Sequence, residues 1–195
     1  MSTKNQKMSI ETTVLAGLLT AIVIVLQMLG SFIRLGPFQI CLVLLPIVIG
    51  AATCGTGVST WLGFVFGLVV LLNGDAAPFL AIDVFGTIIT VMLKGIASGL
   101  AAGLIYKLFS KINRYFAVVA AALVCPFVNT GIFLLGCRIF FFAAIKDWGI
   151  ADGFDNAVQY MFLGLVGGNF LVELGSNILL SPVIVRLINV RQVNN

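Results

Sequence analysis

The chain has 195 residues, of which 61% are hydrophobic and 9% are charged, and its mean hydropathy is +1.16. A soluble domain carries roughly 25% charged residues, so this composition predicts an integral membrane protein, with residues 1–195 forming a single domain. The formal net charge of +4 comes from basic residues that do not gather on one polar face, which argues against a nucleic-acid partner. The sequence contains no histidine, which excludes Ser-His-Asp and Cys-His catalysis and every histidine-based metal motif.

Apolar runs separated by polar breaks predict an all-α membrane protein with six transmembrane helices. In chain order they cover about residues 10–29, 39–52, 58–72, 84–109, 115–144 and 158–188. A span takes roughly 20 apolar residues, so the second and third helices are of marginal length. The fifth is long enough to tilt or to break near Pro126. The segments 73–83 and 146–155 are expected to be polar loops that either cover a pocket or serve as plain connectors.

The distribution of charge predicts the orientation. With six spans both termini share one side, and that side holds seven basic residues: Lys4, Lys7, Lys107, Lys111, Arg114, Arg186 and Arg191. The opposite side holds two basic residues, Arg34 and Lys146, together with five aspartates. Basic residues are enriched in cytoplasmic segments, so we expect the N and C termini in the cytoplasm and a multi-pass protein of the cell membrane.

Small residues recur every four positions on three of the predicted helices. They are Thr13, Gly17 and Ala21 on the first, Gly63 and Gly67 on the third, and Gly95, Gly99 and Gly103 on the fourth. Such stripes let helix backbones approach closely in lipid. On the third and fourth helices we interpret them as packing inside the bundle. On the first helix the stripe either packs internally or faces another subunit.

Polar side chains within the predicted spans are concentrated in the second half of the chain. Asn169, Glu173 and Asn177 stand at i, i+4 and i+8, on one helix face within an apolar run. The fourth and fifth helices add Lys94, Asn129 and Arg138. A carboxylate at membrane depth needs a partner, a cavity or water. One interpretation is a structural ion pair of Glu173 with Lys94 or Arg138, and the other is a pocket for a small polar molecule.

The expected ligand-binding residues are therefore Lys94, Asn129, Arg138, Asn169 and Glu173, and Asn177 is the member of the stripe most suited to a structural role. The sequence has no paired-aspartate metal motif, no nucleophile elbow and no phosphate-binding loop, so we expect no enzyme activity, no metal and no cofactor. The four cysteines lack C-x-x-C spacing and are interpreted as buried apolar residues. Any ATP-driven step must come from another polypeptide.

Several segments together resemble a known family. Leu45-Pro46-Ile47-Val48-Ile49-Gly50-Ala51, Trp61-Leu62-Gly63-Phe64-Val65-Phe66-Gly67, Phe85-Gly86-Thr87 and Leu93-Lys94-Gly95 are similar to the substrate-binding (S) components of energy-coupling factor (ECF) vitamin transporters. The first helix, with Leu15-Ala16-Gly17-Leu18-Leu19-Thr20-Ala21, resembles the small-x-x-x-small helix of that family. Here Gly17 and Ala21 replace the two alanines that are usual at these positions.

The resemblance implies a binding protein that takes one vitamin from outside, mainly through helices four to six, under outer loops. It implies partners as well, namely a transmembrane coupling subunit on which helix one docks through Thr13, Gly17 and Ala21, and two ATPase subunits. The chain would topple in the bilayer to release its cargo inwards.

The identity of the vitamin stays open at this point. Lys94 and Arg138 suit a carboxylate such as pantothenate, whereas the many aromatic residues suit a flat ring such as riboflavin. Two other classes of function compete with this one. The first is a stand-alone secondary carrier or channel in which Glu173 relays protons or cations, and the second is a structural membrane subunit without a ligand.

Overall fold

The computed structural model describes residues 10–30, 34–35, 38–39 and 42–193, with side chains over 10–30 and 42–186. Its helices are α1 (Ile10–Gly30), α2 (Leu44–Thr53), α3 (Thr56–Leu72), α4 (Ala77–Leu80), α5 (Val84–Phe109), α6 (Arg114–Phe140), α7 (Phe142–Ala151), α8 (Ala157–Gln159) and α9 (Gly168–Val193). A π-helix, η1 (Tyr160–Gly167), leads into α9, and β1 (Arg34–Leu35) pairs antiparallel with β2 (Phe38–Gln39). Lys4, Lys7 and Cys41 lie outside the described residues.

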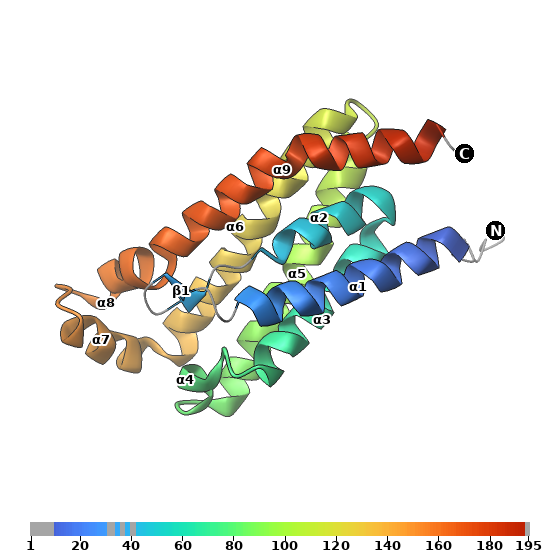
Figure 1. The fold of residues 1–195 in the computed structure, drawn as a ribbon. Coiled ribbons are helices and arrows are strands. Elements are labelled where there is room, and N and C mark those ends of the chain that lie inside the picture. Colours follow the sequence, from blue (N-terminus) through green and yellow to red (C-terminus); the bar gives the residue numbers. More distant parts are fainter. Residues whose placement is uncertain (1–9, 31–33, 36–37, 40–41, 194–195) are drawn as a thin grey trace, which may run out of the picture.

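The long helices form one bundle around the short helix α2 (Figure 1). α5 packs between α3 and α6, α9 packs on α6, and α2 contacts α1, α3, α5, α6 and α9. In the described part of the chain, four segments are long and apolar enough to cross a membrane, namely α1, α5, α6 and residues 157–186, while α2 and α3 are shorter apolar helices. The chain is thus an α-helical, multi-pass membrane protein. Six crossings and the orientation of the termini stay predictions.

Local sequence signals explain where the helices begin. The side chain of Asp83 accepts a hydrogen bond from the backbone N–H of Gly86 at the start of α5. Asn113 does the same for Tyr115 and Phe116 at the start of α6. Such caps satisfy backbone donors that have no partner within the helix. Gly55 has φ 91° in the sharp link between α2 and α3, a conformation that side chains with a Cβ rarely adopt.

Two predicted boundaries were wrong, each for a physical reason. The second helix begins at Leu44 rather than near residue 39, because Pro46 fits the first turn of a helix but not its interior. The segment 146–155 is not a plain loop. The helix through Pro126 stays continuous to Phe140, and α7 then carries the chain to Ala151, with Ile145 and Gly149 on its buried face.

Glycines bring α3 and α5 into backbone contact, as the packing interpretation requires. A Cβ added at Gly63 would clash with the carbonyl oxygen of Gly95, and one at Gly99 would clash with the carbonyl oxygen of Ser59. Gly67 faces backbone and side-chain atoms of residues 91 and 92 on α5. The small stripes of these two helices are therefore confirmed as internal packing.

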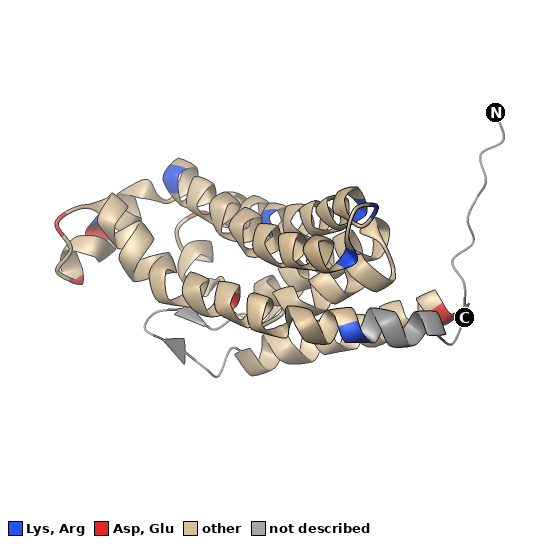
Figure 2. Cartoon of the chain, turned by 90° about the horizontal axis from the view of Figure 1, so that it is seen from above, with Lys and Arg blue, Asp and Glu red and all other residues tan. Residues whose placement is uncertain are grey.

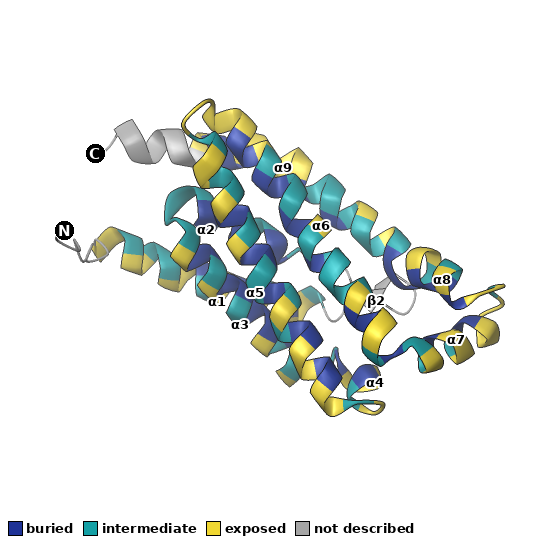
Figure 3. Cartoon of the chain, turned by 180° about the vertical axis from the view of Figure 1, so that it is seen from behind, coloured by how far each residue is buried: buried dark blue, intermediate teal, exposed yellow. Residues whose placement is uncertain are grey.

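Charge is distributed unevenly along the bundle. Acidic positions dominate the end that carries α7 and α8, and basic positions mark the turn between α5 and α6 at the other end (Figure 2). Buried positions lie toward the inside of the bundle and exposed positions on its outer faces (Figure 3). The buried residues form two clusters, one around α2 and a second, richer in aromatic rings, where α4, α6, α7 and η1 meet.

Candidate substrate-binding site

A cavity of about 290 Å³ lies where the two buried clusters meet. α2 has only ten residues, about 15 Å at 1.5 Å per residue, against a hydrocarbon thickness of about 30 Å. The same five helices that surround α2 supply most of the cavity lining, but α2 supplies none of it. A central helix that stops partway through the bundle thus leaves interior space, and the cavity occupies it.

The lining is mostly aromatic, with polar groups converging from several elements. The rings are Phe66, Phe79, Phe133, Trp148, Tyr160 and Phe170, and the polar residues are Gln27, Asp75, Lys94, Asn129, Thr130, Asn169 and Glu173. An apolar cavity with a few placed polar groups is the usual form of a small-molecule site. A volume near 300 Å³ is at the small end of the range for such sites, which suits a compact ligand.

Asn169 and Glu173 face the cavity from consecutive turns of α9. The Nδ2 of Asn169 donates a hydrogen bond to Oε1 of Glu173 at 3.1 Å. Because the carboxylate can only accept, this bond directs the amide nitrogen to Glu173 and leaves the amide oxygen for another partner. Both that oxygen and Oε2 of Glu173 are buried without a hydrogen bond, and Glu173 is only 2% exposed.

Lys94 reaches the cavity from α5. Its Nζ lies 5.5 Å from the ring centroid of Phe66 and 5.2 Å from that of Phe133. Both distances are within the range of a cation–π attraction. In the described part of the chain Lys94 makes no ion pair with Glu173, and Oε2 of Glu173 has no hydrogen-bond partner, so the structural ion pair between these two residues is not formed.

Asn129 supplies a third acceptor, from α6. Its side chain is 5% exposed, and its Oδ1 is buried without a hydrogen bond. Leaving a buried acceptor unpaired costs about 1–3 kcal/mol. Three such oxygens around one cavity favour a bound molecule or ordered water that donates hydrogen bonds to them.

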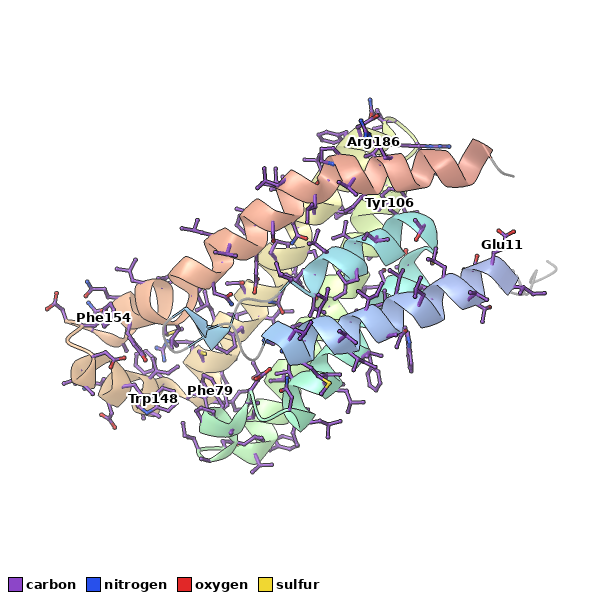
Figure 4. The ribbon with its side chains drawn as sticks, in the orientation of Figure 1. Glu11, Phe79, Tyr106, Trp148, Phe154 and Arg186 are labelled. Carbon is purple, nitrogen blue, oxygen red and sulfur yellow. The ribbon has the colours of Figure 1, made fainter. Side chains whose placement is uncertain are left out.

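The segment after α3 and the segment between α6 and η1 cover one side of the cavity. Asp75 accepts hydrogen bonds from Gln27 at 2.7 Å and from Asn73 at 2.6 Å, which ties this cover to α1. Phe79 makes an edge-to-face contact with Trp148 at 5.6 Å between ring centroids (Figure 4). Of the two interpretations of these segments, the geometry therefore favours a cover over plain connectors.

The lining also includes η1, an eight-residue π-helix that contributes Tyr160, Leu165 and Val166. π-helical turns are rare in proteins overall, and those that occur are often found at functional sites. Gly167 ends η1 and Gly168 begins α9, one residue before Asn169. The unusual turn thus sets the position of the polar face of α9.

The structure brings together four of the five predicted ligand residues and leaves out Arg138. Arg138 is exposed, stacks over the ring of Phe142 at 4.1 Å and lines a separate apolar groove. It follows Asn129 by nine residues, or 2.5 helical turns, so the two side chains leave α6 on opposite faces. Asn177 is 1% exposed and does not line the cavity.

Sequence reasoning missed Gln27 and Asp75 as lining residues, as well as the individual rings. Gln27 carried a signal, because it is an amide within the apolar run of the first helix. Asp75 was assigned to a covering loop without a specific contact. The rings carried no signal, since one phenylalanine among sixteen cannot be assigned to a cavity from sequence alone.

The small stripe of α1 faces outward. Thr13, Gly17 and Ala21 are all exposed, and a Cβ added at Gly17 would meet nothing within 4 Å. Ile10, Val14 and Leu18 on the same helix are also exposed. Of the two interpretations of this stripe, internal packing does not fit the structure.

Among the described residues no group of three or more Cys, Asp or Glu side chains is placed to hold a metal ion.

The family profile described as ECF transporter, substrate-specific component, matches residues 11–185. No curated protein and no solved structure matches the chain significantly.

Proposed function

Because the chain belongs to the substrate-specific components of ECF transporters, we propose that it binds one water-soluble vitamin and delivers it to an ATP-driven module for uptake. Proteins of this family bind small molecules and work with a membrane coupling subunit and ATPases. The supporting observation is the cavity at the end of α2, with its aromatic lining and three unpaired acceptors. Riboflavin and pantothenate represent the two ligand classes under consideration.

We assign direct ligand contact to Lys94, Asn129, Asn169 and Glu173. Three separate helices supply these side chains, and each side chain lines the cavity. A site assembled in this way depends on the correct packing of α5, α6 and α9 against one another. Arg138 is not part of this assignment.

The exposed stripe of Thr13, Gly17 and Ala21 is the proposed docking surface for the coupling subunit. A strip of small residues lets a partner helix approach closely within the bilayer, where apolar burial alone does not drive association. Hydrolysis of ATP then belongs to two partner ATPases, and the chain itself is not an enzyme.

The proposed topology has six crossings, made by α1, by the segment that ends with α2, and by α3, α5, α6 and the combined segment of η1 and α9. Both termini are cytoplasmic, residues 1–195 form one domain and the membrane is the cell membrane. The basic residues at the end of the bundle where α1 begins support this orientation. Arg186 and Glu11 lie at that end, away from Trp148 (Figure 4).

Mass spectrometry of small molecules released from the purified protein tests this function directly. We expect one vitamin at close to one molecule per chain, together with ATPase subunits in a mild-detergent purification. A chain without any vitamin, which transports a substrate with a dependence on pH but not on ATP, would contradict the proposal. That result would favour the carrier in which Glu173 acts as a relay.

A further inference from the structure

We propose that the ligand is a neutral, flat heterocycle that presents N–H or O–H donors to Asn169 and Glu173 and a carbonyl acceptor to Lys94. This inference rests on the proposed function, because it names the class of vitamin that the same cavity takes. It decides between the two ligand classes that the sequence leaves open.

The first step concerns hydrogen-bond donors. Three oxygens that face this site are buried without a hydrogen bond, namely Oδ1 of Asn129, Oδ1 of Asn169 and Oε2 of Glu173, and each can accept one. The bond from Asn169 to Glu173 sets the orientation of the Asn169 amide. A flip of this amide would point its oxygen at the Glu173 carboxylate and lose the bond, so it is the oxygen that is left for the ligand. A ligand that satisfies the site must therefore donate at several points.

The second step concerns charge. The ionisable residues that line the cavity are Lys94, Asp75 and Glu173, so the lining offers one basic group and two acidic groups. A ligand carboxylate would add a further negative charge beside Glu173 and Asp75 and would face unpaired acceptor oxygens. A cationic ligand would meet Lys94. A neutral ligand avoids both repulsions.

The third step concerns Lys94 itself. In the described part of the chain its Nζ contacts two aromatic rings and makes no hydrogen bond or ion pair. An ammonium has three donors and no acceptor, so it needs an oxygen or a ring nitrogen from the ligand. A carbonyl on the edge of a heterocycle supplies that acceptor without adding charge.

The fourth step concerns shape. Six aromatic side chains line the cavity, and Phe79 makes edge-to-face contacts with Phe133 and Trp148. Aromatic walls bind a flat ring over a large area at little conformational cost. A flexible acyl chain would gain less from the same walls and would lose more rotational freedom on binding.

The experiment is a set of titrations of the purified protein with three groups of vitamins. The neutral heterocycles are riboflavin, pyridoxine and nicotinamide, the carboxylates are pantothenate, nicotinate, biotin and folate, and the cation is thiamine. We expect the tightest binding from a neutral heterocycle. Tightest binding of a carboxylate or of thiamine overturns this inference and leaves the proposed function intact, whereas binding of none of them overturns the proposed function itself.

A second measurement places the donors on the proposed residues. With the tightest ligand, Glu173→Gln and Asn169→Ala are each expected to weaken binding roughly ten- to hundredfold, because each removes an acceptor from a buried hydrogen bond. If riboflavin is that ligand, its 3-methyl derivative, which lacks the ring N–H, is expected to lose a similar factor.

Arg138→Gln is the matched control, because this exposed side chain lies outside the cavity. This variant should bind the ligand with the same affinity as the unmodified protein. Melting curves of all variants identify any loss that comes from unfolding. Unchanged affinity in both Glu173→Gln and Asn169→Ala, with unchanged melting, overturns the assignment of the donor edge.

Discussion

Replacing Gly95 by alanine should push α5 away from α3 and so loosen the wall of the cavity that α5 forms. The added Cβ would clash with the carbonyl oxygen of Gly63 and would lie 3.3 Å from the backbone nitrogen of Gly67. These atoms belong to the α3 backbone, so no side-chain rotation relieves the contact and the two helices must separate. Overpacking of this kind costs about 1–3 kcal/mol.

Gly175→Ala is the matched control for this change. It lies within α9, and a Cβ there would meet nothing within 4 Å. Alanine is favoured over glycine in a helix by about 1 kcal/mol, and both variants share this gain. The difference between them therefore isolates the packing cost, about 1–3 kcal/mol, which corresponds to roughly 2–12 °C in melting temperature for a chain of this size.

The assay is thermal unfolding of both variants in the same detergent, followed by titration of the ligand. We expect Gly95→Ala to melt below Gly175→Ala and to bind its ligand more weakly, because Lys94 is the preceding residue on α5 and lines the cavity. Equal melting temperatures, or a higher one for Gly95→Ala, would show that the backbone contact between α3 and α5 does not exist in the protein.

Three further predictions concern docking, topology and the cover of the cavity. Gly17→Trp or Ala21→Trp should abolish co-purification with the coupling subunit and leave ligand affinity unchanged; equal loss of both would indicate internal packing instead. A cysteine replacing Asn113 in a cysteine-free chain should resist membrane-impermeant labelling in intact cells, and labelling from outside would rule out six crossings with cytoplasmic termini. Gln27→Leu removes a 2.7 Å hydrogen bond to the Asp75 carboxylate, a type worth about 1.5–3 kcal/mol, and should speed ligand dissociation by roughly tenfold or more. An unchanged rate would exclude this bond as a restraint on the cover.

Much of the site was predictable because helical periodicity determines which residues share a face. Asn169 and Glu173 are four residues apart, and the structure places both at the cavity. The same arithmetic would have excluded Arg138, whose spacing of nine residues from Asn129 turns it to the opposite face. Intramembrane polar residues share a site only when their angles around the helix agree, and a common helix alone does not bring them together.

Other features were beyond the reach of the sequence. α7 was missed because Lys146 and Asp147 suggested a loop, although both lie on its exposed face while Ile145 is buried. Such a short amphipathic helix has too few turns for its hydrophobic periodicity to be recognised in the sequence. The π-helix had no sequence signal. It differs from an α-helix only in which backbone carbonyl accepts the hydrogen bond from each N–H, and packing against neighbouring helices determines this pattern.

The two walls of the cavity differ in how firmly they are held. Lys94 projects from a helix whose glycines touch the α3 backbone directly, so its position is fixed by contacts that cannot relax without moving a whole helix. Asn169 and Glu173 project from α9 just after η1, where the backbone leaves the regular α-helical pattern and Gly167 and Gly168 form the junction. A ligand held between these walls therefore meets a donor that projects from a tightly packed helix and acceptors that project from a helix preceded by an irregular turn. Any adjustment to ligands of different width is expected on the side of η1 and α9, while the contact with Lys94 stays in place.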